Sequence, residues 1–88
     1  GFGSKRDAVG EVISLLRLAV RDLILLRHGE SVKLKYYTDR DTAEALAGRF
    51  TTRFLLKLYQ GLNTASEGLE ANGNVRLALM QMAVDINA

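Results

Sequence analysis

The stretch from Val9 to Arg27 (VGEVISLLRLAVRDLILLR) constrains the fold most, because it is apolar over more of its circumference than a surface helix needs. At 100° per residue, most of its apolar side chains share one broad face, as in an amphipathic helix packed on a core. That face holds Val9, Val12, Ile13, Leu16, Ala19, Val20, Leu23, Ile24 and Leu26. We therefore expect a long helix at the centre of the domain.

Three leucines do not belong to this face. Leu15, Leu18 and Leu25 fall on the far side of the helix, beside a polar strip that water should contact. A helix that is apolar on two sides is either central to its own domain or covered by a partner. The periodicity alone leaves both explanations open, so these leucines are candidates for a second packing surface.

The composition predicts one globular domain spanning residues 1–88, with residues 1–4 as a frayed start. Of the 88 residues, 48% are hydrophobic and 25% are charged, which suits a folded chain with a modest core. The apolar run is interrupted by Arg17, Arg21 and Asp22, and no signal-peptide pattern opens the chain, so we expect no membrane segment. The absence of cysteine is compatible with a cytoplasmic location.

The ends of the first helix carry the usual signals. Ser4 or Asp7 is expected to cap its beginning, and Gly29 is expected to take the left-handed conformation that ends it. Residues 30–38 (ESVKLKYYT) alternate like a short strand but have no partner strand, so we predict a loop. Its contacts with the helices would come from Val32, Leu34 and one of Tyr36 and Tyr37.

Two further helices are predicted in the middle of the chain. Asp41 and Glu44 have the spacing of a capping box and should open a short helix that Gly48 weakens. Thr51 or Thr52 can cap the next helix, which has the cleanest amphipathic pattern in the sequence. Its apolar face holds Thr51, Leu55, Leu58, Leu62, Ala65 and Leu69. Gly61 and Gly68 inside it indicate close helix approach or a bend.

The last helix should begin after Gly73, which can take a positive φ, with Asn74 as its N-cap. One face of this segment is formed by Leu77, Met80, Ala83 and Val84, and the apolar surface continues around it through Leu79, Met82 and Ile86. Short connections between helices favour antiparallel neighbours. The predicted fold is therefore all-α: a compact antiparallel helical bundle of three long helices plus one short helix.

The sequence offers no catalytic constellation. His28 is the only histidine and there is no cysteine, so metal sites and nucleophilic pairs built from these residues are excluded. The neighbouring carboxylates of Asp39, Asp41 and Glu44 are explained by helix capping. No glycine-rich phosphate loop is present. We therefore expect no enzymatic activity in this segment and no cofactor.

A set of basic residues suggests DNA binding as an alternative function. They comprise Lys33, Lys35, Arg49, Arg53 and Lys57, with the two tyrosines of the predicted loop among them. Such a set could bind DNA phosphates while a tyrosine stacks on a base, and that binding would weaken steeply with salt. The net charge of only +2 gives this alternative little further support. A self-associating bundle is a third possibility.

Two segments resemble a known family. They are VRDLILLRHG (residues 20–29) and LEANGNVRLALMQMAVDI (residues 69–86). These resemble the C-terminal domain of bacterial clamp-loader subunits of DNA polymerase III, in which an Arg-Asp pair followed by leucines and a basic-Gly end closes one helix and an Asn-x-Asn-x-x-Leu-Ala-Leu segment opens the last. The matching residues here are Arg21, Asp22, Leu23, Leu25, Gly29, Asn72, Asn74, Leu77, Ala78 and Leu79.

The resemblance implies a helical collar domain. In that family five such domains, one per subunit, pack into a ring that holds the loader together, while separate ATPase modules act on the sliding clamp and primed DNA. The partners would be other clamp-loader subunits, and helices apolar on more than one face are what such a domain needs. The candidate subunit interface consists of Leu15, Leu18, Leu25, Arg21 and Asp22.

Overall fold

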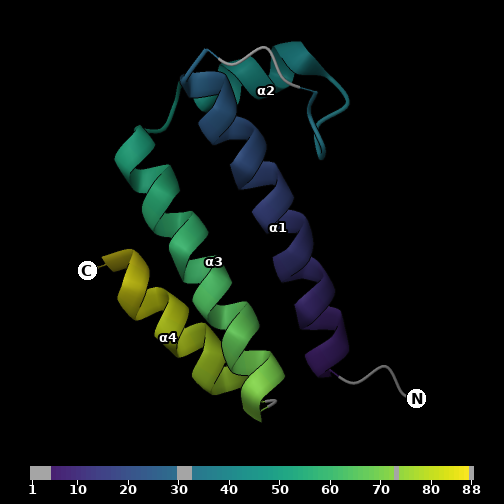
Figure 1. The fold of residues 1–88 in the computed structure, drawn as a ribbon, viewed down its shortest axis with the longest axis vertical. Helices are drawn as coiled ribbons and strands as arrows, with labels where there is room; N and C mark the ends of the chain where they lie inside the picture. The colour runs from purple at the N-terminus through teal and green to yellow at the C-terminus, as the bar shows by residue number, and fades with distance from the viewer. Residues whose placement is uncertain (1–4, 30–32, 73, 88) are drawn as a thin grey trace.

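The computed structural model describes residues 5–29, 33–72 and 74–87, and within these ranges the regular structure is entirely helical. The four helices are α1 (Lys5–Arg27), α2 (Arg40–Ala47), α3 (Thr52–Asn72) and α4 (Val75–Asn87), shown in Figure 1. They contain 23, 8, 21 and 13 residues. The predicted all-α class is confirmed, and the described part of residues 30–38 forms a loop, as predicted.

Helix α3 lies between α1 and α4 and runs antiparallel to both (Figure 1). Helix α2 packs across the C-terminal end of α1. The molecule is flat, with dimensions of 38 × 32 × 16 Å along its principal axes. Because α1 and α4 flank α3 and have little contact with each other, each has a side that no other helix covers.

The core lies between α1 and α3 and extends to the start of α4. Leu55 and Leu62 of α3 are almost completely buried, as their periodicity predicted. The buried hydrophobic side chains that form this core are those of Ile13, Val20, Leu23, Ala47, Leu55, Leu62, Ala65, Leu69 and Ala78. Most of the predicted face of α3 is therefore confirmed, although Thr51 is exposed and precedes the helix.

Three predicted helix ends are confirmed. Gly29 follows α1 with a φ of +71°, the left-handed conformation in which glycine is favoured. The Thr51 hydroxyl accepts the backbone N–H of Phe54 at 3.0 Å, and the Asn74 side chain accepts that of Leu77 at 2.9 Å. These caps satisfy N–H groups that the helices themselves cannot.

For the start of α1, the described residues bear on only one of the two predicted caps. The helix begins at Lys5, so Asp7 lies inside its first turn and does not cap it. A carboxylate there still stabilises the positive end of the helix dipole. Ser4, the other predicted cap, and Gly73 both lie outside the described residues, as does Val32.

The predicted capping box at Asp41 is wrong. Helix α2 begins at Arg40, and its N-cap is Asp39, whose side chain accepts the backbone N–H of Asp41 at 3.1 Å and the Thr42 hydroxyl at 2.6 Å. Glu44 pairs with Arg40 one turn earlier, at 3.1 Å, and does not reach back to the cap. Asp39 and Asp41 stand two residues apart, and either carboxylate could have formed the cap. Asp39 forms it, because its carboxylate accepts hydrogen bonds from both Asp41 and Thr42.

The contact of α3 with α4 depends on small residues. A Cβ atom on Gly61 would lie 3.1 Å from Cγ1 of Ile86 and 3.3 Å from the carbonyl oxygen of Met82. At Gly68 the Cβ atom would make an ordinary contact, 3.6 Å from the Cβ atom of Ala78. The predicted close approach is therefore confirmed at Gly61, where no larger side chain fits without movement.

The two apolar sides of α4 differ in exposure. Leu77, Met80, Ala83 and Val84 are exposed, and the helix packs on α3 through the opposite side, which centres on the buried Ala78. Val75, Met82 and Ile86 are half-buried there. Both sides of α4 are apolar, so hydrophobic periodicity could not rank them. The small side chain of Ala78 decides the orientation, because it allows α4 to approach Gly68 closely.

Candidate interaction surfaces

Asp22 is the most deeply buried polar residue that the structure describes, with no exposed surface. Its carboxylate accepts three consecutive backbone N–H groups of the loop before α2: those of Lys35 at 2.9 Å, Tyr36 at 2.8 Å and Tyr37 at 3.1 Å. It also accepts a hydrogen bond from Nη1 of Arg21 at 2.9 Å. The prediction that Asp22 forms part of a subunit interface is therefore wrong: its side chain anchors a loop inside the domain.

The hydrogen bonds to Asp22 determine its ionisation. Burial alone would raise the pKa of this carboxyl, but the backbone N–H groups of residues 35–37 and the Arg21 guanidinium outweigh it and hold the pKa below its ordinary value. The carboxylate is therefore charged at neutral pH. Its bonds fix the loop, which in turn positions Tyr37 against the core and leaves Tyr36 exposed.

The other predicted interface residues differ in exposure. Leu15 is 52% exposed. Leu18 and Leu25 are half-buried, and Arg21 keeps 29% of its side-chain surface while bonded to Asp22. Leu18 lines a shallow hollow together with Arg21 and with Tyr59 of α3. Leu15 is thus the one member of the predicted set that the structure exposes as a large apolar side chain.

An apolar patch on the N-terminal half of α1 extends from Leu15. Val12 and Leu16, which were predicted to be in the core, are 54% and 46% exposed. They continue the side of the helix on which Ala19 and Leu23 are buried. Helix α2 and the loop before it cover that side only near the C-terminal end of α1 (Figure 1). We name Val12, Leu15 and Leu16 the α1 patch.

A second apolar surface lies on the outer side of α4. Leu77, Met80 and Val84 are 51%, 57% and 61% exposed, and their spacings of three and four residues place them in one row along the helix. The segment between Arg76 and Asp85 contains no charged residue. We name these three residues the α4 stripe. The α1 patch and the α4 stripe belong to the two helices that flank α3.

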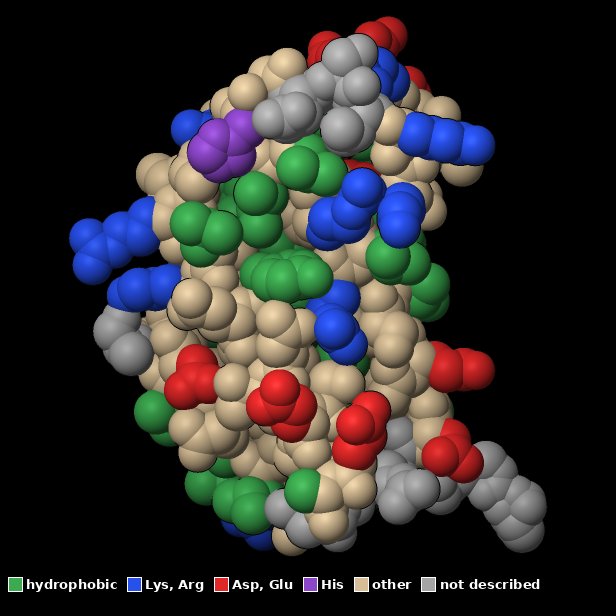
Figure 2. Space-filling view, viewed as in Figure 1, with side chains coloured by type: hydrophobic (Ala, Val, Ile, Leu, Met, Phe, Trp, Pro, Cys, Tyr) green, Lys and Arg blue, Asp and Glu red, His purple; other side chains and the backbone are tan. Residues whose placement is uncertain are grey.

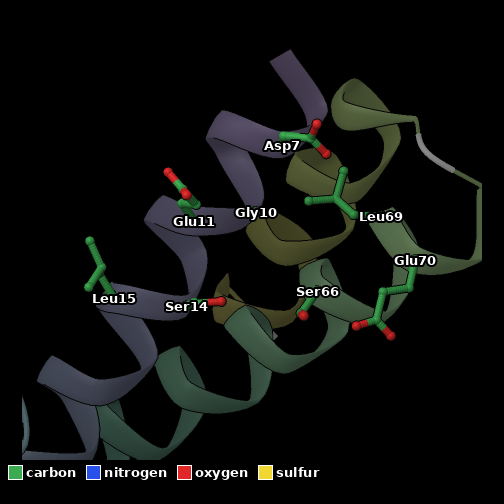
Figure 3. Close-up of a pocket in the computed structure, with 8 residues that line it drawn as sticks. All are labelled: Asp7, Gly10, Glu11, Ser14, Leu15, Ser66, Leu69 and Glu70. Atoms are coloured by element: carbon green, nitrogen blue, oxygen red, sulfur yellow. The ribbon is translucent and has the colours of Figure 1, made fainter. Parts of the chain in front are cut away.

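An open groove of about 780 Å³ runs between the N-terminal half of α1 and the C-terminal half of α3 (Figure 3). Its lining consists of Asp7, Gly10, Glu11, Ser14 and Leu15 from α1 and Ser66, Leu69 and Glu70 from α3. Carboxylates stand on both sides of the groove, and the eight described lining residues include no base, although Arg17 donates to the hydroxyl of Ser66 at 3.5 Å. Because Leu15 lines the groove and also belongs to the α1 patch, the two features are continuous.

The five candidate DNA-binding residues belong to different elements of the structure. Lys33 and Lys35 lie in the loop on one side of α1, whereas α3 begins on the other side (Figure 1). Arg49 precedes α3, so only Arg53 and Lys57 share a helical row. Figure 2 shows most of the Lys and Arg side chains of one face in its upper half, with acidic side chains at the top edge and across the lower half.

Arg27 has a role that the sequence did not reveal. Its Nη1 donates to the carbonyl oxygen of Ala47 at 2.7 Å, and its Nε donates to the Thr52 hydroxyl at 3.1 Å. One side chain thus joins the end of α1 to the end of α2 and the start of α3. A base in the last turn of a helix signals favourable interaction with its own dipole, but the carbonyl it binds here belongs to another helix.

The described residues contain no group of three or more histidine, cysteine or acidic side chains placed to hold a metal ion. His28, at the end of α1, is exposed. Within the same residues, no helix is both long enough and apolar enough to cross a membrane.

Comparison of the chain with protein-family models, curated proteins and solved structures gave no match. The function is therefore inferred from the residues and their geometry. The feature that most needs an explanation is the exposure of six large apolar side chains in two groups, on helices at opposite edges of a flat molecule.

Proposed function

We propose that this chain is a non-catalytic assembly domain, the collar domain of a bacterial clamp-loader subunit that helps load the sliding clamp on primed DNA. The observation that carries the proposal is the presence of the α1 patch and the α4 stripe on the two helices that flank α3. A domain within a ring has a neighbour on each side. It therefore needs two separate surfaces that lose water on assembly.

The exposed side chains give these surfaces a driving force. Burying the remaining surface of a half-exposed leucine or methionine contributes about 1 kcal/mol, before the entropic cost of association is subtracted. Each surface presents two such side chains and one exposed valine. Each can therefore contribute to an interface, and neither needs to hold a complex together alone.

The resemblance supplies the identity of the partners. The segments at residues 20–29 and 69–86 are most like the delta prime subunit of DNA polymerase III, and a compact antiparallel bundle of three long helices and one short helix is the expected form of its collar domain. Val75 and Met80 stand where that family more often has proline and glutamate. The gamma/tau and delta subunits therefore remain alternatives to delta prime.

Reconstitution with the other clamp-loader subunits tests the proposal. Leu15→Asp and Met80→Asp each introduce a charge into one of the two surfaces, and each should weaken incorporation at least about tenfold while leaving the isolated domain folded. Leu56→Asp is the matched control, because Leu56 is 44% exposed on α3 and belongs to neither surface. Incorporation would be measured by native mass spectrometry and folding by circular dichroism. Failure of the unmodified chain to join the subunits contradicts the proposal.

A further inference from the structure

The shallow hollow beside Leu18 contains two arginines. Ser14, Arg17, Leu18 and Arg21 of α1 line it together with Tyr59 of α3, and we name these five residues the arginine hollow. Its volume is about 270 Å³, just below the range typical of pockets for drug-sized ligands, so it has room for a single side chain. The ionisable groups that line it are two guanidinium groups and a phenol, and none of them is an acid at neutral pH.

Arg17 is poorly satisfied within the fold. Its Nη1 donates to the Ser66 hydroxyl at 3.5 Å, which is long for a hydrogen bond. Its Nε is buried and has no hydrogen-bond partner among the described residues, and no carboxylate of those residues forms an ion pair with it. A buried donor without an acceptor costs stability, and the cost is larger for a charged group. An acceptor that enters the hollow would therefore find an unused donor.

The positive charge of the arginine hollow is only partly offset by the fold. Arg21 donates to the carboxylate of Asp22 at 2.9 Å, and that carboxylate also accepts the N–H groups of the loop before α2. Two arginines and one aspartate leave one positive charge. A single carboxylate balances that charge, whereas a phosphate group, with a charge of about −1.5 to −2, would exceed it.

We propose that the arginine hollow binds the carboxylate of an aspartate or glutamate side chain of a partner protein. The Arg17 guanidinium donates from Nε and a terminal nitrogen to the two carboxylate oxygens, the paired geometry for which arginine is suited. The methylene groups of the acidic side chain contact Leu18 and Tyr59, which are both half-buried. This site is separate from the α1 patch and the α4 stripe, and it does not depend on the partner being a clamp-loader subunit.

Two short peptides test the inference on the full chain: acetyl-Leu-Glu-Leu-amide and its counterpart with glutamine in place of glutamate. In an NMR titration we expect the glutamate peptide to bind at least about fivefold more tightly and to shift the Nε–H resonance of Arg17, because hydrogen bonds between charged groups are the stronger ones. Inorganic phosphate at equal ionic strength should bind more weakly than the glutamate peptide. Tighter binding of phosphate would overturn the assignment to a carboxylate.

Arg17→Gln should weaken binding of the glutamate peptide about fivefold or more. Arg53→Gln is the matched control, because Arg53 is an exposed arginine of α3 outside the hollow, and it should leave binding within about twofold of the unmodified chain. Circular dichroism checks that both variants fold. Equal losses in the two variants, or an Arg17 Nε–H resonance that does not respond to the peptide, would overturn the inference. Equal binding of the two peptides to the unmodified chain would overturn it even if Arg17→Gln failed to fold.

Discussion

At the scale of single residues, Asp22 matters most for the fold. Its carboxylate accepts the N–H groups of three successive loop residues from a fully buried position. Without it, those N–H groups would lose a charged acceptor in a place that water does not reach. The loop before α2 is therefore held by a side chain of α1 as well as by apolar contacts such as that of Tyr37.

Asp22→Asn should lower the free energy of unfolding by about 3 kcal/mol. The amide keeps one oxygen, which is a weaker acceptor than a carboxylate oxygen, and its NH2 group would face the backbone N–H groups of the loop, which are donors themselves. Chemical denaturation followed by circular dichroism measures the change. Glu44→Gln is a suitable control, because Glu44 is exposed and forms only a surface pair with Arg40. A loss for Asp22→Asn no larger than that of the control would show that the loop does not depend on this carboxylate.

The pH dependence follows from the same residue. The pKa of Asp22 is lower in the folded chain than in the unfolded chain, so its stabilisation is fully present above the unfolded value of about 3.8 and is lost as the pH falls through the folded value. The pKa of Asp39 is also lowered, mainly by the hydrogen bond from the Thr42 hydroxyl, so protonation of Asp39 at low pH also destabilises the fold. We expect melting temperatures to fall steeply below about pH 4, and Asp22→Asn to flatten that slope. An unchanged slope in the variant would contradict the assignment.

At the scale of helices, the packing of α3 on α4 depends on Gly61, where an added Cβ would lie 3.1 Å from Ile86. Gly61→Ala should destabilise the domain by about 1 kcal/mol, because crowding outweighs the better helix propensity of alanine.

Gly10 gives the opposite case within α1, since nothing lies near its Cβ position. Gly10→Ala should stabilise by about 0.5 to 1 kcal/mol. Thermal melts of both variants measure the difference, and equal effects would contradict this account of the contact.

Sequence periodicity predicted α3 correctly because its two sides differ strongly in polarity. It could not choose between the two sides of α4, where the stripe residues Leu77, Met80 and Val84 are as apolar as the side that packs. It also failed for Val12 and Leu16, since no pattern in α1 indicates how far α2 extends along it. The helix content and most of the helix ends are local properties of the sequence. Which of two apolar sides is covered is a tertiary property.

The candidate site was predictable only in part, for the same reason. The excess of leucine in α1 predicted a second apolar surface on its far side, but Leu18 and Leu25 are half-buried, and Leu15 is exposed beside Val12 and Leu16 of the predicted core face. The polar pair of Arg21 and Asp22 looked like surface, because the sequence does not show that the loop at residues 35–37 turns its N–H groups toward the helix. The acidic groove was not foreseen, since its lining comes from segments more than 50 residues apart.

At the scale of the whole molecule, the five candidate DNA-binding residues come from three different parts of the chain, so no single helix presents them in one row. Lys33 and Lys35 lie in the loop before α2, Arg49 precedes α3, and Arg53 and Lys57 lie within α3. We expect no binding of duplex or primed DNA near physiological salt in a fluorescence anisotropy titration of the isolated chain. Tight binding with a steep dependence on salt concentration would favour the DNA-binding alternative.

The central claim is that the α1 patch and the α4 stripe are both covered in an assembled complex. Covalent footprinting of side chains, read out by mass spectrometry, measures this directly on the isolated chain and on the reconstituted clamp loader. The account predicts that Leu15 and Met80 are labelled in the isolated chain and protected in the complex, while Leu56 is labelled equally in both. Equal labelling of Leu15 and Met80 in the two samples would contradict it.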